Sequence, residues 1–344
     1  MPLLVDLRSD TVTRPSQAMR EAMAAADVGD DVLERDPTMA ALEDRVAQLV
    51  GSEAGLWLPS GSMSNLVALM AHLTRGDTFL APKAAHVLGH ELGTAAWLAG
   101  GMPRELPWSV APGVPAPGDV TAIVQGPPPI YYELRPKLLV LENTHNEAGG
   151  TILPPPIYAD LVEAAHAGGL AVHLDGARIW HVAAALGLTP AAVAGDADTV
   201  TVCLSKGLGA PMGSVLAGPS SLIVEARRLR KMLGGGVRQG GVVAAAGLVA
   251  LEQELPRIDE DRLRARRLAA GLRELGLDAP DPDTNILIVR PPATTGAADL
   301  AARWNAAGVG CFPMGVGVRL VTHRDVDDAG VDLALELIAG SDSD

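Results

Sequence analysis

A lysine and an aspartate each follow a stretch of sequence that predicts a buried strand. Residues 170–174 form an apolar run that ends at Asp175, and residues 199–204 form another that leads into Lys206. In an open α/β sheet, ligands bind beyond the carboxyl ends of the strands, so we expect both side chains at one edge of the sheet. Lys206 is one of four lysines in the chain, which limits the candidates for chemistry that needs an amine able to lose its proton.

A third feature suited to ligand binding lies upstream. The run 55–58 leads into the Gly/Ser-rich turn 60–65 and then into a helical pattern, and the free N–H groups at such a helix start suit a phosphate. Taken singly, the turn could be an ordinary capped helix, Asp175 a strand-end acid and Lys206 a surface lysine. Together they supply what pyridoxal phosphate needs: a lysine for a Schiff base, a carboxylate for the pyridine nitrogen and a cradle for the phosphate.

The elements that must position these groups alternate along the chain. Short apolar runs bounded by Gly, Pro or Asp predict buried strands, and helical periodicity lies between them. The predicted strands cover residues 55–58, 78–81, 137–141, 170–174, 199–204 and 214–217, and the predicted helices cover 38–50, 63–73, 157–167 and 220–232. Buried strands alternating with helices indicate an α/β fold with a mainly parallel central sheet that is covered on both faces.

The pattern changes after about residue 250. A long charged helix is predicted over 257–275, followed by a strand at 285–289, a helix at 297–307, a strand at 318–322 and a last helix from 325. We therefore expect a large α/β domain over residues 1–250 and a smaller C-terminal α+β domain over residues 251–344.

Composition narrows the class of protein. The 344 residues are 48% hydrophobic and 3% aromatic, so the core must be aliphatic, and 27 basic against 41 acidic residues give a formal charge of −14. That charge argues against binding to nucleic acid or to an anionic membrane and favours a small-molecule ligand. Two cysteines, Cys203 and Cys311, cannot form a disulfide framework, and no signal-type or membrane-length apolar run is seen, so we expect a cytoplasmic protein.

Asp175 and Lys206 stand within longer motifs. These are residues 6–15 (DLRSDTVTRP), 29–32 (GDDV) with 36–38 (DPT), 141–146 (LENTHN), 173–178 (HLDGAR) and 204–211 (LSKGLGAP). Further motifs are residues 230–236 (RKMLGGG) and 318–323 (VRLVTH). Together they resemble the motifs of low-specificity L-threonine aldolases, and the resemblance extends over nearly the whole chain.

The resemblance implies an enzyme of the aspartate aminotransferase fold, fold type I, that uses pyridoxal 5′-phosphate. Such enzymes cleave β-hydroxy-α-amino acids, among them L-threonine and L-allo-threonine, into glycine and an aldehyde. A small amino-acid substrate and a homo-oligomer, usually a tetramer built from dimers, are implied as well. Lys206 would form the Schiff base, and Asp175 would pair with the pyridinium nitrogen, so that the ring accepts the electrons of the Cα–Cβ bond.

The resemblance also assigns residues around the cofactor and the substrate. His86 would stack on the ring, and Lys231 and Arg238 would reach the phosphate from a neighbouring subunit. The other residues assigned to the cofactor are Gly61, Ser62, Met63, Arg178 and Ser205, and those assigned to the substrate carboxylate are Ser9, Arg178 and Arg319. The base that removes the β-hydroxyl proton is left open between His86 and a water held with help from Glu91.

Two positions depart from the family pattern near the β-substituent and hydroxyl of the substrate. Leu33 stands where a tyrosine is usual, and an expected histidine aligns with Tyr132 or, alternatively, Tyr131. Leucine gives an apolar wall, and a tyrosine is a poor general base at neutral pH, so we expect weaker activity on threonine relative to phenylserine. The alternative is that both tyrosines pack in a loop and touch no substrate.

The same residues allow other interpretations. His86, His90 and Glu91 have the spacing by which a helix holds zinc, and Glu142 with His145 could add ligands, so a metal hydrolase is one alternative. A second is a non-catalytic relative that binds the cofactor or a partner without turnover. A third is another pyridoxal-phosphate reaction, namely β-elimination, racemisation or transamination, which only the resemblance argues against.

Overall fold

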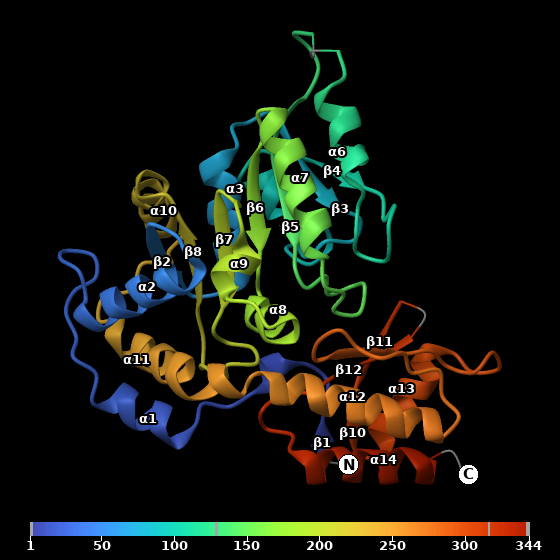
Figure 1. The fold of residues 1–344 in the computed structure, drawn as a ribbon. Coiled ribbons are helices and arrows are strands. Elements are labelled where there is room, and N and C mark those ends of the chain that lie inside the picture. The colour runs from blue at the N-terminus through green and yellow to red at the C-terminus, as the bar shows by residue number, and fades with distance from the viewer. Residues whose placement is uncertain (1–2, 128–129, 316, 342–344) are drawn as a thin grey trace.

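The computed structural model describes residues 3–127, 130–315 and 317–341, and its centre is a seven-stranded sheet (Figure 1). The strand order is β2-β8-β7-β6-β5-β3-β4. The strands are β2 (Ala54–Leu58), β3 (Asp77–Pro82), β4 (Met102–Leu106), β5 (Arg135–Glu142), β6 (Ala171–Asp175), β7 (Thr199–Cys203) and β8 (Ser214–Gly218). Within the described residues, β8 alone runs antiparallel to its neighbours, which confirms the mainly parallel sheet.

Helices cover both faces of this sheet, as the alternating pattern predicts. Leu139 and Leu141 of β5 face one core, whereas Leu138 and Val140 face another on the opposite side, because successive strand residues alternate between faces. The first face is covered by α2 (Pro37–Val50), α6 (Pro117–Val124), α7 (Pro155–Ala167), α8 (Ile179–Leu186), α9 (Pro190–Ala194) and α11 (Gly241–Val249). The second is covered by α3 (Gly61–His72), α4 (His86–Gly89), α5 (Thr94–Trp97) and α10 (Ser220–Met232).

The C-terminal part builds a second unit with its own core. It contains α12 (Asp259–Glu274), α13 (Ala297–Ala306), α14 (Asp328–Ser341) and the antiparallel strands β9 (Ile286–Val289), β11 (Phe312–Met314) and β12 (Gly317–Val321). The short N-terminal strand β1 (Val5–Asp6) pairs with β10 (Val309–Gly310) of this unit. Val5 and Leu7 are buried in the core of this C-terminal unit, although the expected division assigns residues 1–250 to the large domain. Burial of their apolar side chains beside β10 stabilises this position.

Several helices were not predicted from the sequence, α1 (Gln17–Ala24) and α11 among them. Because α11 is apolar on almost every side, it has no periodic pattern to reveal it. It continues through a π-helical stretch, η2 (Ala250–Glu254), and a 3-10 turn, η3 (Leu255–Arg257), into α12, so helical residues cross the expected boundary (Figure 1). In the described part of the chain, no helix combines the length and apolarity needed to cross a bilayer.

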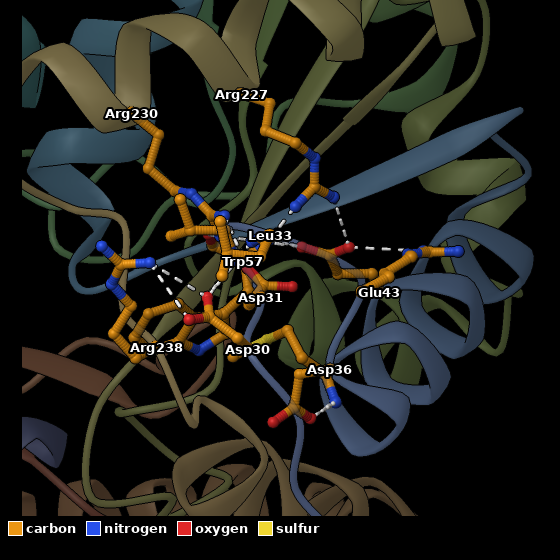
Figure 2. A network of polar contacts seen from close by, with 12 residues as sticks. Asp30, Asp31, Leu33, Asp36, Glu43, Trp57, Arg227, Arg230 and Arg238 are labelled. Carbon is orange, nitrogen blue, oxygen red and sulfur yellow. Dashed lines mark hydrogen bonds and ion pairs between the residues drawn. The ribbon is translucent and has the colours of Figure 1, made fainter.

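A buried network of charges joins the loop before α2 to α10 (Figure 2). Arg230 is 2% exposed, and its guanidinium donates to Asp31 over 2.6 Å and to the carbonyl of Trp57 over 2.9 Å. Glu43 on α2 accepts from Arg227 over 2.7 Å and from the N–H of Trp57 over 2.9 Å. Asp31 and Arg230 are 199 residues apart in the sequence, so two separate motifs meet here and hold each other in place.

Replacing Arg230 by methionine is expected to destabilise the protein, because the buried Asp31 carboxylate would lose its closest cation. Removing one partner of a buried ion pair costs about 3–5 kcal/mol, which urea unfolding would measure as a fall in the free energy of unfolding. Arg228→Ala is the control on the same helix, since its exposed pair with Glu225 contributes only about 0–1 kcal/mol. Equal losses for the two variants would contradict the importance of the buried network.

Candidate active site

The carboxyl ends of the parallel strands open into one cavity of about 420 Å³. β6 ends at Asp175, β7 leads into Ser205 and Lys206, and β2 leads into Ser60 at the start of α3. These three strands run in the same direction, so their ends meet at one edge of the sheet. The C-terminal unit contributes Arg319, on β12, to the same cavity.

Most residues predicted for the site lie around this cavity. Its walls include Ser9, Gly61, Ser62, His86, Asp175, Arg178, Ser205, Lys206 and Arg319, and Glu91 is buried against His86. The predicted residues that do not line the cavity of the single chain are Glu91, which lies behind His86, and Met63, Leu33, Tyr132, Lys231 and Arg238. The Leu33 and Tyr132 side chains are 82% and 71% exposed on the surface.

Asp175 is a buried carboxylate with hydrogen-bond donors but no cation in contact. Its Oδ1 accepts from the N–H of Ala177 over 3.1 Å, and its Oδ2 accepts from the side chain of Asn65 over 2.8 Å. Among the described residues, none forms an ion pair with Asp175. A buried carboxylate in these surroundings favours a positively charged ligand atom beside it.

His86 and Glu91 form a hydrogen-bonded pair beside Asp175. The Nδ1 of His86 lies 2.7 Å from Oε1 of Glu91, and its backbone N–H donates to Glu142 over 2.7 Å. Burial opposes a charge on the imidazole, but the hydrogen bond to Glu91 and the nearby carboxylates raise the pKa of His86 above its ordinary value. Burial also raises the pKa of Glu91. The pair is suited to share one proton, which leaves the second ring nitrogen of His86 for a ligand.

The start of α3 provides an anion site. Ser60 caps the helix, because its hydroxyl accepts from the N–H of Met63 over 3.2 Å. The N–H groups of Gly61 and Ser62 belong to the first turn, where a helix offers no partner of its own. A Cβ on Gly61 would lie 2.9 Å from the sulfur of Cys203, so a glycine is needed for this close approach. Two free N–H groups at the positive end of a helix suit a phosphate.

The two arginines predicted to bind the substrate carboxylate have different surroundings. Arg178 is buried and already donates to both oxygens of Asp10, over 2.7 and 2.8 Å. Arg319 donates to the carbonyl of Arg8 over 3.2 Å and to the amide oxygen of Asn146 over 3.1 Å, and burial lowers its pKa to about 10. No carboxylate in the described residues pairs with Arg319, so this guanidinium is the better placed to bind an anionic ligand.

Sequence reasoning assigned no specific partner to Asp10, Asn65 or Asn146, although all three organise the site. Asp10 and Asn146 lie inside the matched motifs 6–15 and 141–146, so a signal was present. What the sequence lacked was the spatial pairing, since Asp10 meets its arginine across 168 residues and Asn65 meets Asp175 across 110.

The residues suggested for a zinc site have other partners. His90 contacts Glu147 over 2.9 Å at the mouth of the cavity. Glu142 accepts from two backbone N–H groups, and His145 lies 3.1 Å from the carbonyl of Lys83. Through these contacts, the three side chains stabilise the loops that surround the cavity.

A different trio, His86, Glu91 and Asp175, does bring its possible ligand atoms within 4.8 Å of one another. One oxygen of each carboxylate already accepts from the same side-chain amide of Asn65. The amide therefore occupies the space between the two acids that a shared metal ion would need.

Comparisons with known proteins identify the fold and the family. The family model described as "Beta-eliminating lyase" matches residues 6–293. The solved threonine aldolase of Leishmania major has a TM-score of 0.82 at 19% identity, covering 97% of this chain and 98% of that one. A double mutant of Thermus thermophilus aspartate aminotransferase has a TM-score of 0.73 at 20% identity, covering 99% and 92%. The fold is therefore fold type I of the pyridoxal-phosphate enzymes, and the class of protein is a lyase.

The low specificity L-threonine aldolase of Escherichia coli O157:H7 is 46% identical over 325 residues, which cover 94% of this chain and 95% of that relative. The chain therefore belongs to the low-specificity L-threonine aldolase family, whose members are pyridoxal-phosphate-dependent lyases. The resemblance of the motifs is confirmed.

Glu91→Gln is expected to lower the pKa of His86, because the substitution removes the carboxylate that stabilises the charged imidazole. An NMR titration of the histidine ring in the purified protein would follow the change. In the unsubstituted protein the midpoint should lie above the ordinary histidine value of about 6.5. Glu147→Gln, beside the exposed His90, is the matched control and should leave His86 unchanged. A His86 midpoint unaffected by Glu91→Gln would contradict the proposed pair.

Proposed function

We propose that this chain binds pyridoxal phosphate in the cavity at the sheet edge and cleaves β-hydroxy-α-amino acids into glycine and an aldehyde. The observation that carries the proposal is the convergence of an amine, a carboxylate and an anion site on one cavity. These are Lys206, Asp175 and the N–H groups of Gly61 and Ser62. Membership of a family of lyases supports the reaction class.

The residues present fit the cofactor. Lys206 would hold it covalently, and the buried Asp175 would keep a proton on its ring nitrogen. Gly61, Ser62 and Ser205 would donate to its phosphate, while the N–H of Met63 already serves the Ser60 cap. Bound in this way, pyridoxal phosphate supplies an acceptor for the electrons of the Cα–Cβ bond.

The substrate carboxylate would bind at Arg319, with Ser9 and Arg178 beside it. Arg319 is buried, lacks an anionic partner among the described residues and lines the same cavity as Lys206. A guanidinium binds a carboxylate through two parallel hydrogen bonds and so fixes its orientation. That orientation decides which bond to Cα stands perpendicular to the cofactor ring, and hence which bond breaks.

The proton of the β-hydroxyl would pass to His86. Its Nδ1 is held by Glu91, so the other ring nitrogen is the atom that would accept the proton, directly or through a water. As the proton leaves, the Cα–Cβ bond breaks and the aldehyde departs, and Cα then takes up a proton to give glycine. Only the uncharged imidazole can accept a proton, so activity should fall as the pH drops through the raised pKa of His86.

The test of the proposed function is an assay with a lysine variant. Purified protein incubated with L-threonine, L-allo-threonine or L-phenylserine should release glycine and the matching aldehyde in equal amounts, whereas β-elimination would release ammonia and a keto acid. Lys206→Ala should lose the visible absorption of bound cofactor on dialysis and should lose activity, and Lys83→Ala, at an exposed lysine, should keep both. Cofactor trapped by borohydride on Lys83 would contradict the assignment.

We also propose that the active enzyme is a homo-oligomer in which Lys231 and Arg238 complete the phosphate site of a partner subunit. In the single chain Lys231 is exposed, and Arg238 is 53% exposed while it pairs with Asp30 over 3.1 Å. Leu33 lies within the same group of side chains (Figure 2), and the N–H of Asp31, two residues before it, donates to the carbonyl of Arg238 over 2.8 Å. Leu33 would therefore reach a substrate only in the partner's cavity.

The outlying Tyr132 would likewise need another chain, or a movement of its loop, to contact the substrate. A preference for phenylserine over threonine would therefore depend on contacts that Leu33 and Tyr132 make in the oligomer. The cytoplasm is the location we propose, which the two unpaired cysteines support.

Mixing two inactive variants tests the shared site. Lys206→Ala and Lys231→Ala homodimers should each be impaired, because each lacks one part of both cavities. Subunits mixed in equal amounts and allowed to exchange should regain about one quarter of full activity, since about half of the dimers carry one intact site of two. Lys206→Ala mixed with the Lys206→Asn variant is the control and should regain nothing. No recovery in the first mixture would contradict the shared site, because it would mean that Lys231 acts together with Lys206 of its own subunit.

A further inference from the structure

Asn65, on α3, is buried between the two carboxylates of the site. It is 2% exposed, and its side-chain amide donates to Asp175 over 2.8 Å and to Glu91 over 2.9 Å. Its amide oxygen lies 3.2 Å from Nε2 of His173. Both N–H groups and the oxygen of this amide are therefore engaged, and none of the bonds serves the helix that carries it.

The partners fix which way the amide faces. Because the amide oxygen of Asn65 can only accept, Nε2 of His173 must donate to it. Burial lowers the pKa of His173 to about 4, so the neutral ring has an unprotonated Nδ1, which accepts from the hydroxyl of Thr199 over 2.9 Å. The Thr199 oxygen in turn accepts from Nε2 of His72 over 2.9 Å. Every donor in this series therefore points toward the carboxylates.

The amide matters because of what it separates. Two buried carboxylates at short range repel each other. The amide places one N–H on each carboxylate, so it stabilises the negative form of both. It also links Asp175 to the pair formed by Glu91 and His86, two groups that otherwise belong to separate loops.

We propose that Asn65 is a positioning residue that holds the Asp175 carboxylate in the orientation that faces the cofactor nitrogen, with His173 holding the amide in the required direction. This inference rests on the proposed function, because it assumes that a cationic ring nitrogen binds at Asp175. Asn65 also lines the cavity, but this role does not depend on a contact of its own with cofactor or substrate. It acts through Asp175 on one side and through Glu91 on the other.

The neighbouring Ser64 provides a matched comparison. It lies on the same helix, is equally buried and forms one buried hydrogen bond, to Thr201 over 2.8 Å. That bond joins the helix to β7 and involves neither carboxylate. A change at Ser64 thus costs a buried polar contact without disturbing Asp175 or Glu91.

The experiment compares Asn65→Leu with Ser64→Ala in the cofactor-bound protein. Asn65→Leu should weaken pyridoxal phosphate binding by about tenfold or more, because a charged acceptor loses its donor. The pH midpoint of the visible absorption of bound cofactor should shift by about one unit, since the carboxylate beside the ring nitrogen loses the donor that holds it in place. Ser64→Ala should keep both values near those of the unsubstituted protein, even where it lowers the melting temperature.

A second variant keeps the proposal falsifiable if Asn65→Leu fails to fold. His173→Leu should shift the same pH midpoint in the same direction, and it should add nothing to the shift in the double variant, because both act through one amide. Additive shifts, or an unchanged midpoint in Asn65→Leu or in His173→Leu, would overturn the proposal.

Nitrogen NMR of the unsubstituted protein gives a readout that does not need the cofactor. His173 should be neutral with its proton on Nε2 between about pH 5 and pH 9, as a pKa of about 4 requires. A proton on Nδ1 would reverse the series of donors and overturn the inference. Unsubstituted protein that binds no pyridoxal phosphate at all would instead refute the proposed function, whatever the state of His173.

Discussion

The structure is organised around two buried charges that the described chain does not neutralise. Asp175, at the end of β6, has no cation in contact, and Arg319, on β12, has no carboxylate. Leaving a charge buried and unpaired is costly, so such groups persist where a ligand completes them. Both line one cavity with Lys206. A ligand pair with a cationic ring nitrogen at one end and a carboxylate at the other, as pyridoxal phosphate with an amino acid presents, matches the two charges.

The charges that the chain does neutralise have a different purpose. Arg230 with Asp31 and Arg178 with Asp10 are buried ion pairs in which each charge has an opposite charge in contact within the protein. Such pairs add little net stability over apolar packing, but they specify which segments meet. The distinction separates the two arginines proposed for the substrate carboxylate, since Arg178 already pairs with a carboxylate and Arg319 pairs with none in the described residues. Because Arg178 is held by Asp10, it also fixes the N-terminal segment to the loop that follows β6.

The sequence predicted the cavity because its main groups follow strands, and strand ends are recognisable one element at a time. Asp175, Lys206 and the turn before α3 were found in this way. Asn65 and His173 were not given a joint role, since their contact depends on a helix and a strand that are 108 residues apart meeting face to face. Helix α11 escaped for the opposite reason, because a helix that is apolar all round has no periodicity. Lys231, Arg238 and Leu33 lie outside the cavity of one chain, so neither the sequence nor the fold of a single chain can fix what they touch.

A short N-terminal segment fixes the residues proposed to bind the cofactor relative to those proposed to bind the substrate carboxylate. Asp10 accepts from Arg178 of the large unit and from Asn285 of the C-terminal unit, so a single carboxylate ties the two units together. Three residues later, the hydroxyl of Thr13 donates to the carbonyl of Lys206 over 2.9 Å, which attaches the same segment to the residue proposed to carry the cofactor. The segment continues from β1, whose pairing with β10 anchors it to the C-terminal unit. Arg178, Arg319 and Lys206 are all hydrogen-bonded to this one N-terminal segment. Their relative position is therefore set by hydrogen bonds and not by the packing of the two units alone. Control of the bond that breaks at Cα requires this kind of rigidity, since a small rotation of the substrate carboxylate would align a different bond with the ring.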